Sequence, residues 1–275
     1  MKKIGIVLKP NHPQGKGTLE KLVSWLKQRD KDVLLIDPPK ENRTPPPSMD
    51  LIIVLGGDGT LLSVARLVSG LDIPILGVNL GGLGFLTEIT LEELYPDLEK
   101  ILKDEFLEDP RLTLKSYVLR KEKQYSQPTV LNDVTVHKGI LSNLIELKIT
   151  INGQFVTSLR ADGLIVASAT GSTAYSLSSG GPIVHPSVDA IVLTPIAPHM
   201  LTNRPIIVPS SAGIDVALKE GEDGPVVMLD GQEAFPMQGG DVLHIEADDK
   251  RIKLIRSPHR NYYHVLRQKL KWGEF

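Results

Sequence analysis

The stretch that decides the fold of this chain is Leu51-Ile52-Ile53-Val54-Leu55-Gly56-Gly57-Asp58-Gly59-Thr60. Its first five residues are apolar and rich in β-branched side chains, which predicts a strand buried on both faces, as in a parallel sheet. Glycines follow where that strand must end, and residues 61–68 have the spacing of a helix. A strand, a glycine turn and a helix in this order aim backbone N–H groups and a helix dipole at an anion, most often phosphate. Because a carboxylate repels phosphate, we expect Asp58 to handle a hydroxyl or a metal ion beside the phosphates.

The turn at 56–60 could also be a simple tight turn or belong to another phosphate-binding motif. Glycine is common wherever φ is positive, so the stretch could be only a tight turn. It does not match the Walker loop, and no Gly-x-Gly-x-x-Gly pattern follows the first apolar strand. We favour a phosphate-binding turn, because five specific residues follow a fully apolar strand and lead directly into a helix. The chain is therefore predicted to be a phosphotransferase.

The composition is typical of a soluble globular protein. A length of 275 residues is enough for one large or two ordinary domains. Apolar and charged contents of 41% and 23% are ordinary for soluble proteins, and a net charge of −2 gives no reason to expect nucleic acid as a partner. The sequence has no stretch long and apolar enough for a membrane span and no signal-peptide core, so we expect no membrane partner. The absence of cysteine excludes disulfides and thiolate metal sites and fits a cytoplasmic location.

The first hundred residues alternate strand and helix patterns, which predicts a doubly wound α/β domain. The predicted elements are strands at 3–9, 33–36, 51–55 and 73–78 and helices at 18–31, 60–69 and 91–103. Thr90 and Glu93 match a capping box for the last of these helices. The segment at 38–47 is so rich in proline that we expect a loop. Ligands of such sheets bind beyond the carboxyl ends of the strands, where the 56–60 turn falls.

From residue 111 the pattern changes to period-two alternation, which predicts a mainly β second domain. The predicted strands lie at 112–120, 129–137, 145–151, 154–159, 164–167, 190–193, 213–218, 226–229, 241–246 and 251–255. Asn152-Gly153 is a hairpin signal, and residues 262–270 have a helical pattern. We therefore divide the chain into an α/β domain at 1–108, a mainly β domain at 109–257 and a helical segment at 258–275 that returns to the first domain.

Three further segments are candidates for ligand contacts. Residues 79–86, rich in glycine, follow the strand at 73–78 and should form a second turn at the same sheet edge as 56–60. The small and hydroxylated residues at 168–182 let a ligand approach the backbone closely, and Tyr175 among them could flank a base; a solvated surface loop is the alternative. Asn132-Asp133 interrupts a strand pattern, which indicates a bulge or a ligand contact. The histidines are scattered, so we assign no protein ligand to a metal.

Together these motifs resemble those of bacterial-type NAD kinases. Gly56-Gly57-Asp58-Gly59, Asn132-Asp133, Asp162-Gly163 and residues 170–176 occur in the order and spacing of that family, and the resemblance covers nearly the whole chain. It implies transfer of the γ-phosphoryl group of ATP, accompanied by Mg²⁺, to the 2′-hydroxyl of the adenosine ribose of NAD, giving NADP. It also implies a Rossmann-like α/β domain and a C-terminal β-sandwich-like domain with NAD between them, in a homodimer or homotetramer.

The resemblance also assigns roles to residues of this chain. Asp58 is the implied catalytic base, and Gly56, Gly57, Gly59 and Thr60 would hold the phosphate donor. The positions that match NAD contacts are Asp58, Gly59, Asn132, Asp133, Asn143, Arg160, Asp162, Thr173, Ala174, Tyr175, Ser176, Leu177, Ser178, Ala197 and Gln232. Among them Asp162 is implied at the nicotinamide end and Thr173 to Ser178 on the adenine side. The family commonly has Asn-Glu at 132–133, so we expect the shorter Asp133 to keep the same hydrogen bonds after a small backbone shift.

Two other functions stay open at this point. Lipid kinases and phosphofructokinases share the Gly-Gly-Asp-Gly turn, so the acceptor could be another hydroxyl; the lipid kinases continue soon after it into Asn-Glu-Val, whereas Leu61-Leu62-Ser63-Val64 follows here. A non-catalytic NAD(P)-binding sensor is the second alternative, against which stands the intact Asp58. The sequence also leaves ATP and inorganic polyphosphate open as donors.

Overall fold

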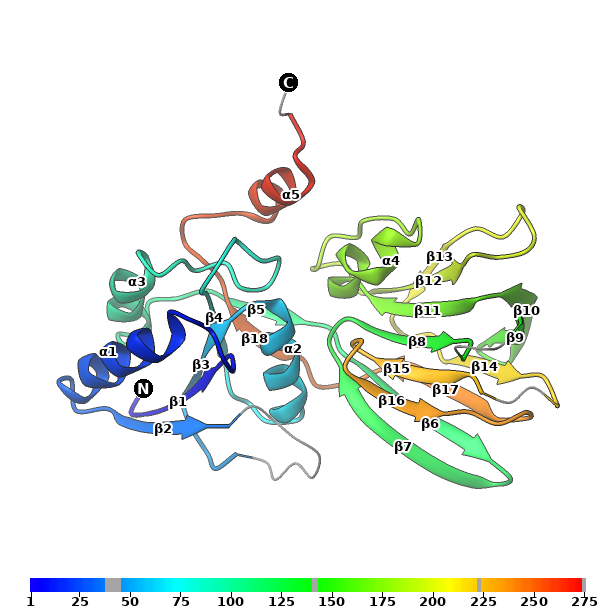
Figure 1. The fold of residues 1–275 in the computed structure, drawn as a ribbon, viewed down its shortest axis with the longest axis horizontal. Coiled ribbons are helices and arrows are strands. Elements are labelled where there is room, and N and C mark those ends of the chain that lie inside the picture. Colours follow the sequence, from blue (N-terminus) through cyan, green and yellow to red (C-terminus); the bar gives the residue numbers. More distant parts are fainter. Residues whose placement is uncertain (38–45, 140–142, 222–223, 274–275) are drawn as a thin grey trace. The chain divides into compact units, whose positions relative to one another are not determined.

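The computed structural model describes residues 1–37, 46–139, 143–221 and 224–273 (Figure 1). The loop predicted at 38–47 falls mostly outside these residues. The chain divides into two compact units, Met1–Pro110 with Ile252–Phe275, and Arg111–Arg251. In the part of the chain that the structure describes, no helix is long and apolar enough to cross a membrane.

The first unit is built on a six-stranded sheet with the strand order β2-β1-β3-β4-β18-β5. Its elements are β1 (Lys3–Leu8), α1 (Gly15–Lys27), β2 (Asp32–Ile36), β3 (Leu51–Gly56), α2 (Asp58–Leu67), β4 (Ile75–Asn79), α3 (Leu94–Ile101), β5 (Glu108–Arg111), β18 (Ile252–Ile255) and α5 (Tyr262–Leu270). Strands β1 to β4 pair in parallel, as in doubly wound folds. The prediction of a Rossmann-like α/β domain is confirmed.

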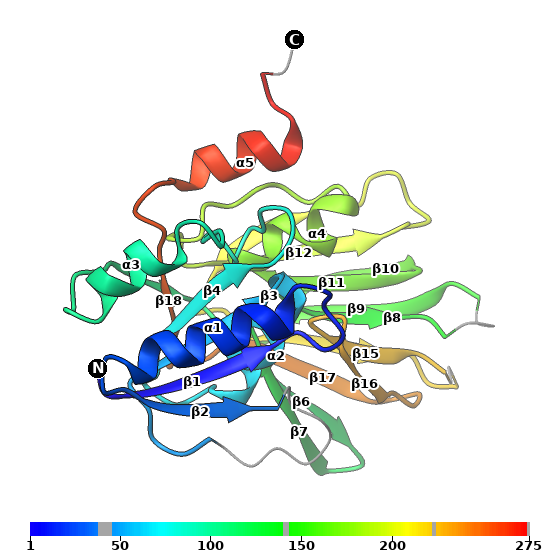
Figure 2. The ribbon, with the colours of Figure 1, turned by 60° about the vertical axis from the view of Figure 1, so that its left-hand side comes forward.

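Helices cover both faces of this sheet, which is why its central strands are apolar throughout. Leu26 of α1 and Leu98 of α3 share one core with Leu76 and Val78 of β4. Side chains of a strand alternate between faces, so Gly77 points to the other face, where Leu61 of α2 packs against it. Figures 1 and 2 show α1 and α3 on one side of the sheet and α2 on the other.

Several predicted boundaries or placements in the first unit are wrong. Helix α1 spans Gly15–Lys27 rather than 18–31. Helix α2 begins at Asp58 rather than at residue 60, with Gly57 as its N-cap. Helix α3 begins at Leu94 rather than at 91, although the Glu93 carboxylate does accept from the Thr90 N–H at 3.0 Å, as a capping box requires. The strand predicted at 251–255 in the second domain pairs instead with β4, because a short apolar pattern predicts a strand but not the sheet that it joins.

The second unit consists of two six-stranded sheets, in the orders β10-β9-β14-β17-β6-β7 and β13-β12-β11-β8-β15-β16. Its elements are β6 (Leu114–Arg120), β7 (Lys123–Val130), β8 (Asp133–His137), β9 (Ile145–Ile151), β10 (Gln154–Ala161), β11 (Gly163–Ser168), the 3₁₀ helix η1 (Thr170–Thr173), α4 (Tyr175–Ser178), β12 (Ala190–Ile196), β13 (Ile206–Pro209), β14 (Ile214–Leu218), β15 (Val226–Leu229), β16 (Glu233–Pro236) and β17 (Val242–Ala247). Ile149 and Leu243 of the first sheet share one core with Val134 and Val166 of the second. The prediction of a β-sandwich-like domain is confirmed.

The strand predicted at 129–137 is broken in two. Strand β7 ends at Val130 in one sheet, and β8 begins at Asp133 in the other, so the chain crosses between the sheets at Leu131 and Asn132. The polar Asn132-Asp133 pair therefore marks a strand junction. Strands β5, β13 and β16 and most of β7 were not predicted; each of them contains a proline, which weakens a strand pattern.

Candidate functional site

The ends of β3 and β4 bring the two predicted glycine-rich turns together in the first unit. Gly56 and Asn79 are paired in register at the carboxyl ends of these strands. The Oδ2 atom of Asp58 accepts from the N–H of Phe85 at 2.8 Å. Its Oδ1 atom accepts from the N–H of Leu86 at 3.1 Å and from both the N–H and the hydroxyl of Thr87 at 3.0 Å. Asp58 thus holds the second turn, and we call Asp58 with residues 84–87 the Asp58 corner.

Gly84 makes this corner possible. A Cβ atom at Gly84 would lie 2.1 Å from Asp58 Oδ1 and 2.4 Å from the hydroxyl oxygen of Thr87. The side-chain amide of Asn79 donates to the Thr87 hydroxyl at 2.8 Å, which fixes Thr87 in turn. Gly84 and Thr87 were not among the predicted site residues; the glycine-rich pattern at 79–86 was a signal for Gly84, but it ends one residue before Thr87.

The hydrogen bonds of the Asp58 corner hold the Asp58 carboxylate in one orientation and leave it able to accept one more hydrogen bond. Each oxygen of an ionised carboxylate accepts about two hydrogen bonds. Oδ1 already has three donors, whereas Oδ2 has one and has room for another, such as a hydroxyl group. A Cβ added at Gly57, the N-cap of α2, would meet nothing within 4 Å, so the helix N-terminus beside Asp58 is open to a ligand.

A second corner lies in the second unit, where the chain crosses between the sheets. The Asp230 carboxylate accepts from the N–H groups of Leu131 at 3.3 Å, Asn132 at 2.8 Å and Asp133 at 3.2 Å. Asp230 and Gly231 have φ of 49° and 63° and are the central residues of the turn between β15 and β16, in which the Gln232 N–H donates to the Leu229 carbonyl at 2.9 Å. We call residues 131–133 with Asp230 the Asp133 corner. Asp230 was missed as a site residue, although the Asp-Gly turn signal stood in the sequence.

The Asp133 side chain is buried and short of donors. It is 5% exposed, and its Oδ1 atom accepts from the Thr135 hydroxyl at 3.1 Å. Burial, together with the nearby Asp230 carboxylate, raises the pKa of Asp133 to about 7. A ligand that donates a hydrogen bond would favour the ionised form of this acid.

Asp133 opens into a cavity of about 470 Å³ that follows β8. Its wall extends from Asn132 to His137 along β8 and includes Met228 of β15. Of the residues predicted to contact NAD, four line this cavity: Asn132, Asp133, Ala174 and Tyr175. Tyr175 is 43% exposed, as a residue whose ring stacks on a ligand must be in the free protein.

A second group of predicted residues lies at the far end of β8. Asp162 directly precedes Gly163, which pairs with His137 at the end of β8. The backbone N–H of Asp162 donates to the carbonyl of Ile196, the residue before Ala197. The Asp162 carboxylate forms an ion pair with Lys138 at 2.6 Å. Since a strand rises about 3.3 Å per residue, the two groups lie roughly 15 Å apart along the strand. An extended ligand along β8 would reach both.

The remaining predicted residues do not line the cavity. The Ser176 hydroxyl is buried against that of Thr194 at 2.8 Å, and the Thr173 hydroxyl donates to the backbone of Thr170 at 3.3 Å. The others lie on exposed or half-buried parts of the second unit: Asn143, Arg160, Leu177, Ser178, Ala197 and Gln232. In the first unit, Gly59 and Thr60 belong to the first turn of α2, and a Cβ at Gly56 would lie 2.7 Å from the Thr60 hydroxyl.

Solved structures with the same fold include two nucleotide kinases. The yeast NADH kinase, solved in complex with NADH, is 26% identical with a TM-score of 0.90 and covers 100% of this chain and 89% of its own. An NAD kinase from Archaeoglobus fulgidus, solved in complex with ATP, has a TM-score of 0.80 over 98% of both chains. At 24% identity, the second likeness supports the fold alone.

Sequence relatives define the family more closely. Residues 42–106 match the ATP-NAD kinase N-terminal domain, and residues 131–257 match the ATP-NAD kinase C-terminal domain. The NAD kinases of Syntrophotalea carbinolica and Geotalea daltonii are 46% and 45% identical to this chain, each over 284 residues and 100% of both proteins. The chain therefore belongs to the NAD kinase family, as its motifs predicted.

Proposed function

We propose that this NAD kinase transfers the γ-phosphoryl group of ATP to the 2′-hydroxyl of the adenosine ribose of NAD. Asp58 is the group that would accept the hydrogen bond, and then the proton, of this hydroxyl. The observation that carries this role is the Asp58 corner, where four donors orient the carboxylate and leave Oδ2 room for one more. The alternatives of a sensor and of another hydroxyl acceptor are not favoured, because the full-length relatives are NAD kinases.

Phosphoryl transfer asks a protein mainly for positioning and charge stabilisation. The open N-terminus of α2 and the Gly56–Thr60 turn would hold the donor's phosphates. The 2′-hydroxyl would donate to Asp58 Oδ2 and pass its proton there as the new oxygen–phosphorus bond forms. A general base contributes about 10²- to 10⁴-fold to the rate, and a fixed carboxylate also orients the attacking oxygen.

NAD would lie along β8 in the second unit. The 470 Å³ cavity, the exposed Tyr175 ring and the donor-poor Asp133 carboxylate support the adenosine half at the Asp133 corner. The nicotinamide end would reach Asp162, which lies at the far end of the strand and is paired there with Lys138. The yeast relative is an NADH kinase, so NADH is a second acceptor to be measured.

The divalent cation would arrive with the donor. Among the residues that the structure describes, no group of three or more His, Asp or Glu side chains could hold a metal ion. Mg²⁺ is commonly bound through substrate phosphates and water molecules with few protein ligands, so it would be held mainly by the phosphates of the donor. Bound there, the ion would neutralise charge on the phosphates.

We also propose that the enzyme acts in the cytoplasm as a homodimer or homotetramer. The cysteine-free sequence is compatible with a reducing compartment, and the oligomer rests on the resemblance to NAD kinases. Light scattering coupled to size-exclusion chromatography measures the oligomer directly.

The test of function is turnover by the purified protein. NAD and Mg-ATP are supplied, and NADP is measured with an NADP-specific dehydrogenase; polyphosphate and NADH are tried as alternative donor and acceptor. The proposal predicts NADP formation that requires both NAD and a phosphate donor. Binding of NAD without turnover under any of these conditions would instead support the sensor.

A further inference from the structure

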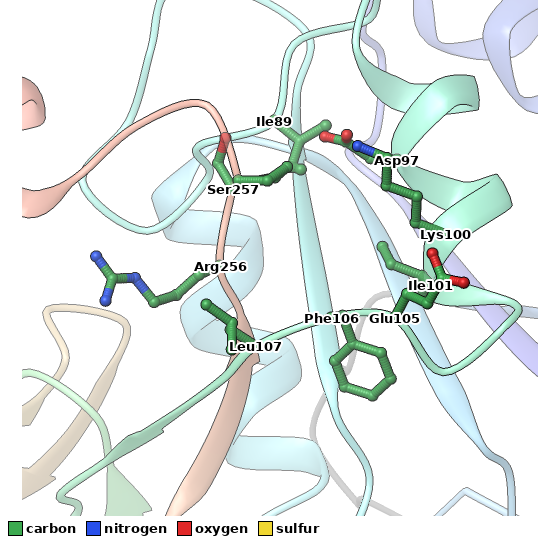
Figure 3. A pocket seen from close by; sticks show the side chains of 10 residues that line it. Ile89, Asp97, Lys100, Ile101, Glu105, Phe106, Leu107, Arg256 and Ser257 are labelled. Atoms are coloured by element: carbon green, nitrogen blue, oxygen red, sulfur yellow. The ribbon is translucent and has the colours of Figure 1, made fainter.

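A separate cavity lies in the first unit, and none of the residues predicted to bind NAD or ATP lines it. Its volume is about 260 Å³, and it lies among α3, the segment before β5 and the segment after β18 (Figure 3). Much of its wall is apolar, formed by Ile89, Ile101, Phe106 and Leu107. An apolar cavity of about 150 Å³ is enough to bind benzene, so this one has room for a single ring with a substituent.

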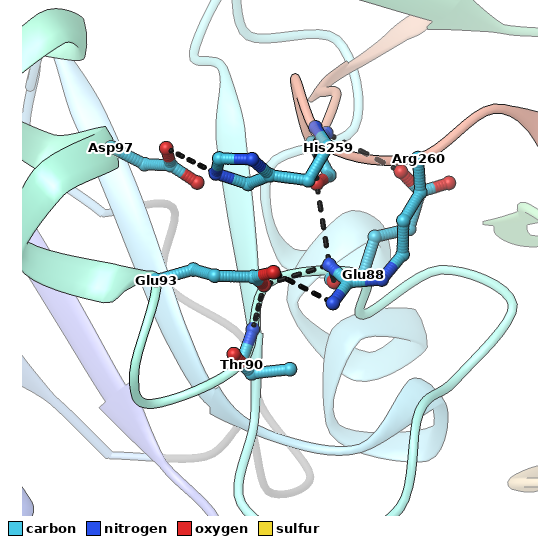
Figure 4. A network of polar contacts seen from close by, with 7 residues as sticks. Glu88, Thr90, Glu93, Asp97, His259 and Arg260 are labelled. Atoms are coloured by element: carbon cyan, nitrogen blue, oxygen red, sulfur yellow. Dashed lines mark hydrogen bonds and ion pairs between the residues drawn. The ribbon is translucent and has the colours of Figure 1, made fainter.

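Four charged residues complete the wall, and Asp97 of α3 is the buried one among them. Lys100 and Glu105 are exposed and Arg256 is half-buried, so water competes for their charges. The Asp97 side chain is 2% exposed, and its Oδ1 atom is 3.0 Å from Nε2 of His259 (Figure 4). Its Oδ2 atom has no hydrogen-bond partner among the residues that the structure describes. A buried carboxylate oxygen without a donor is costly, so this atom is suited to receive a donor from a bound molecule.

The wall around Asp97 is held by a network of polar contacts (Figure 4). The Arg260 guanidinium donates to both carboxylate oxygens of Glu93 at 2.7 Å. This pairing lowers the pKa of Glu93 to about 2. The Ser257 N–H donates to Glu88 at 3.3 Å, and Arg260 donates to the Glu88 carbonyl at 3.0 Å. The segment after β18 is thus tied to the residues before α3, and the cavity is preformed.

We propose that this cavity binds a compact, largely apolar molecule carrying an N–H donor, with the apolar part among Ile89, Ile101 and Phe106 and the donor on Asp97 Oδ2. The donor is required because an ionised carboxylate only accepts hydrogen bonds. The proposal does not depend on the kinase reaction, because it concerns none of the residues assigned to NAD or ATP.

The test uses benzamidine, a flat ring with a cationic N–H donor, and the full-length protein labelled at isoleucine δ1 methyl groups. The methyl resonances of Ile89 and Ile101 are assigned with Ile→Val variants, and Ile165 of the second unit is the reference. We expect benzamidine to shift Ile89 and Ile101 saturably and Ile165 not at all. Toluene, which has no donor, and benzoate, which presents acceptors, should bind at least about tenfold more weakly.

The variant that isolates the donor contact is Asp97→Asn. Its oxygen still accepts from His259, while its NH₂ group replaces the acceptor in the cavity. Benzamidine should bind at least about tenfold more weakly and benzoate more tightly, whereas Asp32→Asn, at an exposed acid of the same unit, should change neither.

Three results would overturn the proposal. One is the absence of a saturable shift at Ile89 and Ile101 with benzamidine up to about 10 mM, near the weak limit of specific binding. Another is equal affinity of the wild-type protein for benzamidine, toluene and benzoate, which needs no variant to fold. The third is an unchanged benzamidine affinity in a folded Asp97→Asn protein.

Discussion

The Asp58 corner and the Asp133 corner share one hydrogen-bonding arrangement but differ in the role of the carboxylate. In each, one carboxylate accepts from three successive backbone N–H groups: Asp58 from residues 85–87 and Asp230 from residues 131–133. In the first corner the clamping acid is itself the expected reacting group. In the second, the clamping acid holds the backbone of another acid, Asp133, whose side chain accepts from the Thr135 hydroxyl.

This difference separates positioning from binding. Asp58 has both oxygens engaged, so its orientation is fixed before a substrate arrives, as catalysis requires. Asp133 is buried beside a like charge, so its pKa is raised and it gains most when a ligand brings a donor. We therefore expect substitutions at the first corner to lower kcat and substitutions at the second to raise the KM for NAD.

The largest expected effect is that of Asp58→Asn. The amide cannot take a proton, and its NH₂ group also faces a backbone N–H donor of the corner. We expect kcat to fall at least about a hundredfold. The assay is NADP formation, with circular dichroism to establish that the variant is folded. A folded variant with a near-normal kcat would remove Asp58 from the chemistry.

Gly84→Ala tests the orientation of Asp58 without changing its charge. The added methyl group would lie 2.1 Å from Oδ1, so the carboxylate must move. Because a displacement near 1 Å can cost about a hundredfold, we expect kcat to fall by about ten- to a hundredfold. The matched control is Gly82→Ala in the same turn, where a Cβ meets nothing within 4 Å and kcat should be retained. Equal kcat values for both variants would contradict the role of the corner.

Asp133→Ala tests the second corner. A lost hydrogen bond to a charged group costs about 1.5–3 kcal/mol, so the KM for NAD should rise by about tenfold or more while kcat changes little. Steady-state kinetics at saturating Mg-ATP measure both. An unchanged KM would place NAD away from Asp133.

Thr87→Val should have a smaller effect at the Asp58 corner. It removes one of four donors to Asp58 and leaves the Asn79 amide without its acceptor. We expect a loss of about 1–3 kcal/mol in the free energy of unfolding and only a few-fold decrease in kcat. Urea unfolding and the NADP assay measure these. A decrease in kcat as large as that of Asp58→Asn would mean that the conformation of residues 84–87, rather than the Asp58 carboxylate itself, determines the rate.

The prediction with the smallest expected effect on activity concerns stability as a function of pH. The pKa of Asp133 is about 7 in the folded protein, against an ordinary value of 3.8 in an unfolded chain. Between these two pH values the folded state therefore keeps a proton that the unfolded state has lost. Stability is therefore lost as pH rises from about 4 to 7, and the loss is complete above 7. Asp133→Asn should lack this decrease, whereas Asp249→Asn, at an exposed acid, should retain it. The measurement is the melting temperature of each protein at several pH values between 5 and 8. The same pH dependence in the wild-type protein and in Asp133→Asn would contradict the prediction.

The sequence predicted the strands and helices with strong periodicity, and the resemblance pointed to Asp58 and Asn132-Asp133. It could not predict what holds them. The partners of Asp58 lie 27 to 29 residues away, and those of Asp230 lie 97 to 99 residues away, distances over which periodicity carries no information. Gly84 is required by a contact across the sheet edge, and β18 joins the first sheet from beyond the second unit. Such features follow from tertiary packing.

The most direct test of the contrast is a carboxyl ¹³C NMR titration of aspartate-labelled protein, with Asp133→Asn used to assign the resonance. We expect the Asp133 carboxyl to titrate near pH 7. Asp230→Asn should move this midpoint to lower pH by removing the neighbouring charge, and saturating NAD should move the wild-type midpoint lower as well. An Asp133 resonance that titrates near pH 4, unchanged by either, would contradict these expectations.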